Sequence, residues 1–439
     1  MICQKEAQGS GRPDQDHLLS LAVEAYLFGF ASVEMFRTMD DLARAERNGL
    51  GLDFNRFTHA RRLAASDSKW LAAPNTEMLY SNAWLDLSQG PVLLEIPDMG
   101  SRYYVVQLLD FFANSHAHLG SRTLGNRGGR LVISGPGWSG QVPEGLTVLE
   151  SPTSFAWILA RIHVRDGEAL PAVNALQDQL EVAPLRASGQ ALAVGERWPR
   201  FRNRSAIDFF VNLDQVLRRN PPRPGDAGWI ARLRQLGLLG DQSREADAID
   251  PGLRGILERA VAIGQQRIAE RESQFENYCP GWIWEGLSAG SGARDHLSRA
   301  ASAKAGLGIL CAEEAIYPLA YVDAQGQPLD GRCSYRLSFS PQELPQAKYF
   351  WWVTVYELPD YRLVANSLSR YVWGSVRGRM EPAADGKFEL LLQPDCPAGS
   401  SSNWLPTPAE GKFAVALRVF GPSQAMLTRR HRLPRVVRL

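Results

Sequence analysis

The first regular pattern of hydrophobic positions in the chain is that of a long helix. It starts at Asp14 or Asp16, either of which can cap it, and ends at Asn48-Gly49. Its apolar residues recur mostly at steps of three and four: Leu18, Leu19, Ala22, Val23, Tyr26, Leu27, Phe30, Val33, Met35 and Phe36. Because one face is strongly aromatic, we expect it to pack in a core, against a sheet, or along a pocket.

The pattern then changes to short alternating runs that are typical of β-strands. Strands are predicted at 78–85, 92–96 and 103–112, and shorter ones at 130–134, 146–149 and 155–164. Gly90-Pro91 and the segment from Pro97 to Gly100 separate the first three strands as turns. This spacing leaves no room for crossover helices, so it predicts antiparallel β-structure.

Helical periodicity returns in the middle of the chain, and a second β-region follows. Helices are predicted at 168–180, 205–219, 228–239 and 252–272, with Ser205 as an N-cap and Asn220-Pro221-Pro222 as a stop. From Ile316 a hairpin pattern surrounds Asp323 to Gln327, and strands are predicted at 349–356, 388–393 and 413–420.

These elements predict an α+β fold with two antiparallel β-sandwich or jelly-roll modules, an N-terminal long helix and a central helical block. A chain of 439 residues exceeds the size at which single cores stop growing, so several domains are expected. We place an N-terminal helical segment at 1–50, the first β-module at 51–185, the helical block at 186–310 and the second β-module at 311–439.

Charge and composition narrow the classes of partner. The 48 basic and 47 acidic residues give a net charge of +1, so no overall field attracts nucleic acid or acidic lipid, and the expected partner is a small molecule or a protein. The tail from Leu427 to Leu439 holds five arginines and one histidine; it is interpreted as an anion-binding arm, a solvated terminus or a strand on a neighbouring subunit.

The cysteines and the N-terminus indicate the cellular compartment in which we expect the protein. Five cysteines never form a C-x-x-C pair, so reduced structural thiols are expected: Cys3, Cys279, Cys311, Cys333 and Cys396. No apolar signal region opens the chain, and no run of eighteen apolar residues occurs. The expected location is the cytoplasm, with no membrane partner, unless a leader was removed.

Two textual matches to catalytic motifs do not fit their surroundings. The G-x-G-x-x-G from Gly135 to Gly140 contains Pro136, and no helix follows that could hold a pyrophosphate, so a β-hairpin turn is the better interpretation. The G-x-S-x-G around Ser288 lacks a parallel strand before it and is interpreted as a small-residue loop. No nucleotide cofactor is therefore expected.

His116 and His118 are the most distinctive candidates for chemistry. Residues two apart in an extended chain share a face, so both imidazoles can reach one metal, as in the H-x-H of cupins. Arg122 stands where that pattern has a glutamate, and the other ligands near in sequence are Glu77, Asp110 and His59. Two hydrogen-bonding histidines are therefore favoured over a metal site, and no cofactor is predicted. His59 lies among arginines, which favour its neutral form if they are close in space, but a histidine on a surface loop is the preferred interpretation.

Laid in order, the motifs resemble the paired DUF1254 and DUF1214 domains, which are named as domains of unknown function. The motifs are PNTEMLYSNAWLDL, IPDMGSRYY, LVISGPGW and SPTSFAWILAR, then EEAIYP, GQPLDG, YRLSF, FWWVTVY and SNWLPTP. The resemblance implies two β-sandwich or jelly-roll modules and no established activity. Thr76-Glu77-Met78 and the H-x-H depart from the family pattern, so a specialised member of a small-molecule pathway is expected.

The matched residues supply further candidates. Tyr104, at the head of a long strand, joins His116, His118 and Arg122 as a catalytic candidate, and Arg122 with Arg102 can clamp a carboxylate. The substrate-binding candidates are Asn75, Tyr80, Arg102, Asn366, Tyr371, Asn403 and Trp404. Each has a structural alternative, because such asparagines stabilise turns and buried aromatic tips bond to backbone carbonyls.

Three functions remain open from the sequence. The favoured one is an enzyme that acts on a small organic molecule, with a carboxylate as the expected anionic group, through the histidine pair and an arginine clamp. The second is a small-ligand binding protein whose aromatic pocket lies between the β-modules. The third is a structural protein in which sandwich edges assemble a homo-oligomer.

Overall fold

The computed structural model describes residues 15–45, 54–68, 73–185, 198–221, 227–240, 249–274, 277–284, 295–376, 380–397 and 402–439. Contacts within the chain divide it into two compact units. The first comprises Met1–Leu52, Glu196–Ser273 and Arg294–Ala305, and the second comprises Asp53–Gly195, Gln274–Ala293 and Gly306–Leu439. The N-terminal and central helices thus share one unit, and both β-regions share the other. The four segment boundaries expected from the sequence stay a prediction.

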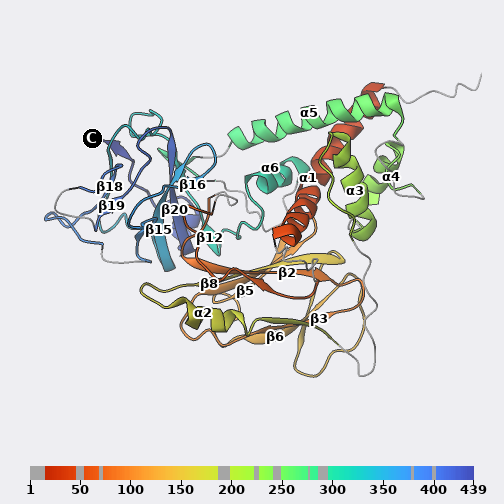
Figure 1. Ribbon diagram of the computed structural model, residues 1–439, viewed down its shortest axis with the longest axis horizontal. Coiled ribbons are helices and arrows are strands. Elements are labelled where there is room, and N and C mark those ends of the chain that lie inside the picture. Colours follow the sequence, from red (N-terminus) through yellow and green to blue (C-terminus); the bar gives the residue numbers. More distant parts are fainter. Residues whose placement is uncertain are drawn as a thin grey trace, which may run out of the picture. The chain divides into compact units, whose positions relative to one another are not determined.

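The helical unit is arranged around its first helix. Helix α1 (Gln15–Ala45) packs against α3 (Ile207–Arg219), α5 (Pro251–Ser273) and α6 (His296–Ala305), and α4 (Ala227–Gln235) adds a smaller contact (Figure 1). The ring of Tyr26 lies 4.3 Å from that of Phe209, and the ring of Phe36 lies 4.9 Å from that of Trp198. These aromatic side chains form a helix–helix core, rather than facing a sheet.

Helix α1 is also long and apolar enough to cross a membrane by length and composition. Its most apolar stretch is 67% buried inside the protein, as is usual for a core helix. A signal sequence near an N-terminus has a similar length and composition. The cytoplasmic location stays a prediction from the sequence.

The first β-module is a sandwich of two sheets. One sheet has the order β1 (Thr58–His59), β2 (Met78–Asp86), β8 (Phe155–His163), β4 (Tyr104–Asp110) and β5 (Ser115–Gly120). The other has the order β7 (Thr147–Glu150), β6 (Gly129–Ser134), β3 (Val92–Ile96) and β9 (Glu181–Pro184), with α2 (Leu170–Gln177) before β9. Leu79, Leu94 and Ile158 are among the fully buried residues of the core between them. Each such side chain contributes roughly 1.5–3 kcal/mol by its burial.

One expectation about this module was wrong in detail. Strands β6 and β7 pair in parallel, so the segment from Gly135 to Gly140 connects parallel neighbours and is not a hairpin turn. Ser288 and its surrounding motif lie outside the described residues.

The second β-module is a sandwich as well. Its larger sheet has the order β10 (Asn277–Cys279), β11 (Trp282–Ile283), β13 (Leu319–Ala320), β20 (Phe413–Pro422), β15 (Ala347–Glu357) and β16 (Arg362–Leu363); β12 (Ala315–Ile316) pairs with β20 and β17 (Trp373–Gly374) with β15. The smaller sheet has the order β19 (Trp404–Leu405), β18 (Phe388–Leu392), β14 (Tyr335–Phe339) and β21 (Val437–Arg438). Helix α7 (Gln424–Leu427) follows β20.

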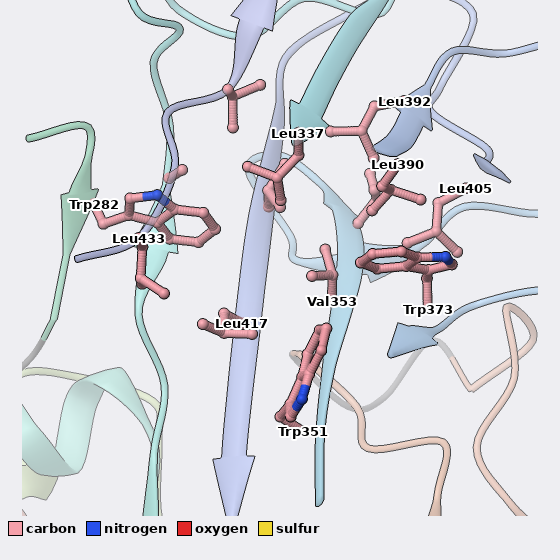
Figure 2. Close-up of a cluster of buried hydrophobic side chains, with 14 of the residues drawn as sticks. Trp282, Leu337, Trp351, Val353, Trp373, Leu390, Leu392, Leu405, Leu417 and Leu433 are labelled. Carbon is pink, nitrogen blue, oxygen red and sulfur yellow. The ribbon is translucent and has the colours of Figure 1, made fainter. Parts of the chain in front are cut away.

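Leucine, valine and tryptophan side chains from both sheets fill the core of this sandwich (Figure 2). Trp282 is fully buried and donates its Nε1–H to the carbonyl of Pro434 at 2.8 Å. The arginine-rich tail therefore lies within its own module, and its last strand, β21, pairs with β14. Anion binding by its arginines stays a prediction.

The expected fold class is confirmed: the protein is α+β, with two mainly antiparallel sandwiches, a long N-terminal helix and a set of central helices. Each sandwich also contains one parallel strand pair, β6–β7 and β18–β19.

Both central sheets also bury parts of the face that points away from their own core. Register places Tyr80 opposite Arg161 on the outer face of one sheet, and Trp352 opposite Arg418 on the outer face of the other. A further apolar cluster includes Met78, Tyr103 and Val105 from the first module and Phe350, Trp352 and Phe420 from the second. The modules therefore meet through these outer faces, and the candidate site lies there.

Candidate functional site

Arg161 is the only lysine, arginine or carboxylate residue on strand β8. Every residue of β8 is buried, and Arg161 is 7% exposed. Its Nη1 donates to Gln107 Oε1 at 2.8 Å, its Nη2 donates to the carbonyl of Gly308, and its guanidinium lies 5.3 Å from the ring centroid of Tyr80. All three partners are uncharged, so they hold the cation in place without neutralising it.

Arg418 occupies the corresponding place in the second module. It lies on β20, in the interior of the larger sheet, and is half-buried. Its Nη2 donates to the carbonyl of Ala73 at 2.6 Å and to the hydroxyl of Tyr356 at 2.8 Å. The rings of Tyr317 and Tyr356 lie 5.4 and 5.8 Å from the guanidinium carbon. Its buried Nε–H has no acceptor among the described residues.

Three tyrosines join these two arginines into what we call the arginine–tyrosine cluster: Arg161, Arg418, Tyr80, Tyr317 and Tyr356. Burial raises the pKa of Tyr317 well above its usual value, while Arg161 and Arg418 both act to lower it. Burial also raises the pKa of Tyr356. The hydroxyls of Tyr317 and Tyr356 therefore stay protonated at neutral pH, and hydroxyl groups can both donate and accept hydrogen bonds.

A buried carboxylate lies near the cluster, and its charge is already paired. Glu314 is 1% exposed; it accepts a hydrogen bond from the Tyr103 hydroxyl at 2.6 Å and from Arg122 Nε at 2.6 Å. Burial and Glu314 together raise the pKa of Tyr103 well above its usual range. Among the described residues, no carboxylate forms an ion pair with Arg161 or Arg418.

The two expected catalytic histidines lie on β5, next to this region. The backbone N–H of Cys311 donates to His118 Nε2 at 3.3 Å, and burial with Arg161 and Arg122 lowers the pKa of His118 to about 4. The pairing of β4 with β5 shifts register between Leu108, which pairs with Ala117, and Leu109, which pairs with Ser115, so His116 lies at this irregularity. No group of three or more potential metal ligands occurs in the part of the chain that the structure describes.

The structure brings some predicted residues together and separates others. Tyr80 belongs to the arginine–tyrosine cluster, whereas Tyr104 points into the core on the opposite face of the sheet and donates to the carbonyl of Gly125 at 3.0 Å. Arg102 donates to Glu168 Oε2 at 2.6 Å and to the carbonyl of His163 at 2.7 Å. Arg102 and Arg122 thus each bind a carboxylate of the protein itself, and neither is a free clamp.

The remaining predicted residues bond to other parts of the protein. Asn75 Oδ1 accepts from the backbone N–H of Glu77 at 2.8 Å, and Asn366 bonds to backbone atoms of Val364 and Arg370. Asn403 Oδ1 accepts from Trp373 Nε1 at 3.1 Å; Tyr371 donates to Ser66 Oγ at 3.2 Å, and Trp404 donates to the carbonyl of Gln393 at 2.8 Å. Asn75, Asn366 and Trp404 thus bond to backbone atoms, as their structural alternatives expect, and the substrate-binding role of all five residues stays a prediction.

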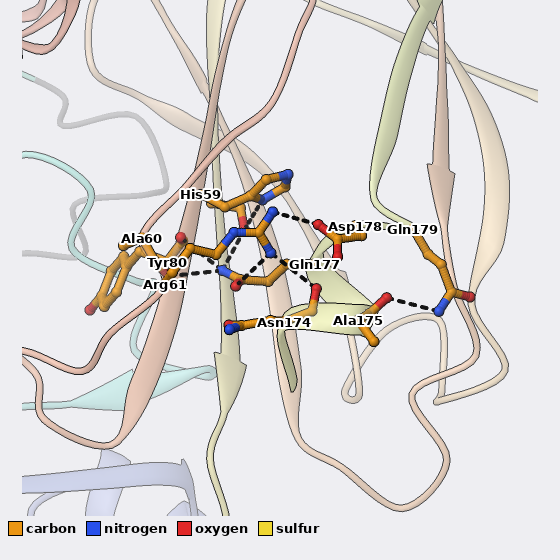
Figure 3. Close-up of polar contacts among 10 residues, drawn as sticks. His59, Ala60, Arg61, Tyr80, Asn174, Ala175, Gln177, Asp178 and Gln179 are labelled. Atoms are coloured by element: carbon orange, nitrogen blue, oxygen red, sulfur yellow. Dashed lines mark hydrogen bonds and ion pairs between the residues drawn. The ribbon is translucent and has the colours of Figure 1, made fainter. Parts of the chain in front are cut away.

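His59 belongs to a separate polar cluster between β1, β2 and α2 (Figure 3). Its Nδ1 lies 2.8 Å from Ser81 Oγ, and burial with Arg61 lowers its pKa to about 4, which agrees with the neutral imidazole expected from its basic neighbours. Gln177, fully buried on α2, donates its amide to the carbonyls of Ala60 and Tyr80 and to Ser81 Oγ. This cluster anchors an edge strand.

Four cluster residues were not among the candidates from the sequence: Arg161, Arg418, Tyr317 and Tyr356. Their signals were present. Arg161 and Arg418 each interrupt an otherwise apolar strand, in FAWILARIH and FAVALRVF, and a lone arginine in a buried strand needs a specific partner. Tyr317 and Tyr356 stand in the quoted motifs EEAIYP and FWWVTVY.

Comparisons with known proteins agree on family and fold. The family described as "Protein of unknown function (DUF1254)" matches residues 54–184, and "Protein of unknown function (DUF1214)" matches residues 314–424. None of the curated proteins matches the chain. The crystal structure of the VPA0106 protein from Vibrio parahaemolyticus is similar, with 21% identity and a TM-score of 0.75 over 96% of this chain and 100% of that one.

A putative uncharacterized protein from Burkholderia cenocepacia has 12% identity and a TM-score of 0.46, over 97% of this chain and 95% of that one. At such identities the similarity to VPA0106 shows the fold alone. The two family matches, in the same order as the motifs, show that the chain belongs to the two-domain DUF1254/DUF1214 family.

Proposed function

We propose that this protein binds a small organic anion, a carboxylate in the first instance, at the arginine–tyrosine cluster between its two β-modules. The observation that carries the proposal is that Arg161 and Arg418 have no carboxylate partner among the described residues. An unpaired cation in a desolvated place costs free energy, and an anionic ligand would remove that cost. Guanidinium groups flanked by aromatic rings are well suited to binding carboxylates.

The partial exposure of the cluster supports a pocket there. Tyr80, Tyr317 and Arg418 keep part of their surface exposed although burial is the main cause of the raised pKa of Tyr317. Side chains that line a recess have both properties. The buried Nε–H of Arg418 is a donor that a ligand can satisfy.

The enzymatic function expected from the sequence stays a prediction, and so does homo-oligomerisation. A general base needs a free lone pair, but His118 Nε2 already accepts from Cys311, and Arg122 already binds Glu314. The geometry at His118 and Arg122 therefore favours ligand binding over acid–base catalysis by these two residues.

Thermal unfolding with carboxylates tests this function. Benzoate, 4-hydroxybenzoate and glutarate would be titrated against the wild-type protein, and a ligand at 100 times its Kd stabilises the folded state by about 2.7 kcal/mol. We expect at least one of them to raise the Tm, and we expect Arg161→Met and Arg418→Met to lose that response.

The matched control is Arg130→Met, which removes an exposed arginine that pairs with Glu95 on β3. This variant is expected to respond as the wild type does. The proposal is wrong if no carboxylate stabilises the wild type, or if both cluster variants keep the full response.

A further inference from the structure

We propose that the ligand of the arginine–tyrosine cluster carries two negative charges and bridges the two β-modules, one charge at Arg161 and the other at Arg418. This inference rests on the proposed function and specifies the class of its ligand. It follows from the number of unpaired cations, from how each is fixed, and from the electrostatic surroundings that they share.

Arg161 is held by Gln107 of the first module and by residues 308–309, which precede β12 of the second. Its Nη1 and Nη2 bond to Gln107 Oε1 and to the carbonyl of Gly308, and Gln107 is itself held by donating to Ser115 Oγ and to the carbonyl of Ile309. The Arg161 side chain therefore cannot change its conformation to pair with a distant carboxylate without breaking several buried hydrogen bonds. An anionic ligand can neutralise its charge without such a change.

Arg418 belongs to the second module, but both modules hold it in place. Its Nη2 donates to the carbonyl of Ala73 in the first module and to the hydroxyl of Tyr356 in the second, and that hydroxyl donates to the carbonyl of Pro74 in the first module. Its Nε–H is buried without an acceptor among the described residues. This donor is available to a ligand, on a guanidinium that two aromatic rings flank.

The two cations share their electrostatic surroundings. Arg161 and Arg418 both act on Tyr317, and Tyr80 lies under Arg161 while interacting electrostatically with Arg418. The buried carboxylate Glu314 is held by Tyr103 and Arg122, so it does not offset this pair. One monoanion leaves an excess positive charge in the cluster, whereas a dianion neutralises it.

Two kinds of small molecule have this chemistry, a dicarboxylate and a phosphate monoester. We favour the dicarboxylate, because each guanidinium sits on a separate sheet and each can take one carboxylate group. A phosphate monoester places both charges on one group. A matched pair of probes distinguishes them.

Isothermal titration of the full chain at pH 8 tests the inference. The probes are malonate, succinate, glutarate and adipate, each compared with its own monoamide, and phenyl phosphate compared with phenyl sulfate. Each pair differs mainly in one negative charge. We expect at least one dicarboxylate to bind the wild type 10-fold or more tightly than its monoamide, and the best chain length to report the separation of the guanidiniums.

Variants locate the effect. In Arg161→Met and in Arg418→Met the ratio between dicarboxylate and monoamide is expected to fall below 3-fold, while Arg130→Met keeps the wild-type ratio. If only phenyl phosphate binds 10-fold or more tightly than its partner, phenyl sulfate, the ligand is a dianion with both charges on one group. That result would contradict a ligand that bridges the two arginines. The affinities of dicarboxylates and monoamides are compared in the wild-type protein alone, so a variant that folds poorly does not affect this comparison.

Two further results overturn the inference in different ways. If monoamides and dicarboxylates bind the wild type equally, the ligand is a monoanion, and the proposed function survives without this refinement. If neither class binds, the proposed function fails as well.

Discussion

At the scale of single residues, the candidate site depends on a glycine as well as on its arginines. Gly308 has a φ of +78°, and a Cβ at this position would lie 2.7 Å from Leu159 Cδ2. Its carbonyl accepts a hydrogen bond from Arg161 Nη2. A residue without a side chain therefore brings the backbone close enough to hold the cation.

We predict that Gly308→Ala lowers the free energy of unfolding by about 3 kcal/mol, because it adds a steric clash to an unfavourable φ. The control is Gly326→Ala, where φ is also +78° but a Cβ would meet nothing within 4 Å. That variant is expected to lose only about 1 kcal/mol. Urea denaturation measures both, and equal losses would show that the contact with Leu159 is not limiting.

The pKa of His118 predicts a pH dependence of stability. Burial and two arginines lower it from 6.5 to about 4, so the folded protein stays neutral at this position while the unfolded chain gains a proton near pH 6.5. The free energy of unfolding should therefore fall as the pH falls from 6.5 to 4, and this contribution should level off below 4.

Urea denaturation between pH 7 and pH 4 tests this for His118→Gln, which should flatten the slope of the wild type. His59→Gln is the comparison, because burial and Arg61 lower the pKa of His59 to about 4 as well. An unchanged slope in His118→Gln would mean that His118 is not a buried neutral imidazole.

The sequence predicted residues at this scale only in part. Tyr80 was identified because its motif is dense in aromatic and polar groups, but Arg161 and Arg418 were not, because no local spacing links β8 with β20. Arg102 and Arg122 looked equally suitable as anion-binding arginines. Their partners Glu168 and Glu314 are 66 and 192 residues away, so only the fold shows that their charges are paired.

At the scale of elements, helix α2 anchors the edge strand β1 and the residues after it, through Gln177 in the interior and through Arg61 at the surface. Gln177 is fully buried and donates to the carbonyl of Ala60 at 3.2 Å, to that of Tyr80 at 3.1 Å and to Ser81 Oγ at 3.0 Å (Figure 3). An edge strand of two residues has few ladder hydrogen bonds of its own, so such a connection determines whether it stays paired.

We predict that Gln177→Leu destabilises the protein by about 2 kcal/mol and speeds hydrogen exchange of the Ala60 amide, which donates to the carbonyl of Tyr80. Gln179→Leu is the control, because Gln179 is exposed and makes a single bond to the carbonyl of Ala175. The control should cost less than about 0.5 kcal/mol. Equal exchange of Ala60 in both variants would contradict the anchoring role.

Strands were predicted correctly where apolar and polar residues alternate between two turn segments, and were missed where this pattern is absent. Val92–Ile96 was predicted to the residue, and β2 differs by one residue at its end. Strand β5 was missed as a strand because Ser115, His116 and His118 give it little hydrophobic signal; its pairing with β4 supplies the reason to form. Helix α6 was missed because its alanines leave little amphipathic contrast.

At the scale of the whole molecule, Glu314 connects the two β-modules. It belongs to the second module and accepts hydrogen bonds from Tyr103 and Arg122 of the first. We predict that Glu314→Gln lowers the free energy of unfolding by about 2 kcal/mol, because it removes the charge that both donors bind.

Calorimetry tests this, with the exposed pair Arg130–Glu95 as the control. Glu95→Gln should cost less than about 1 kcal/mol, since surface ion pairs contribute little. If Glu314→Gln costs no more than Glu95→Gln, Glu314 does not hold the modules together.

The sequence predicted which modules the chain contains, but not which of its elements pack together. Motif order indicated two sandwiches, and both exist. The N-terminal helix shares a unit with helices that follow it by more than 160 residues, and contacts so distant in sequence leave no local pattern. The cluster between the sandwiches arises in the same way, because it needs residues from both halves of the chain.

Diffraction from crystals soaked with 5-bromoisophthalate would show directly whether a dicarboxylate bridges the two arginines, since the anomalous signal of bromine locates the ligand. We expect a bromine peak beside the arginine–tyrosine cluster, with one carboxylate within hydrogen-bond distance of Arg161 and the other of Arg418. A bound ligand located elsewhere, with both arginines still lacking an anion, would contradict it.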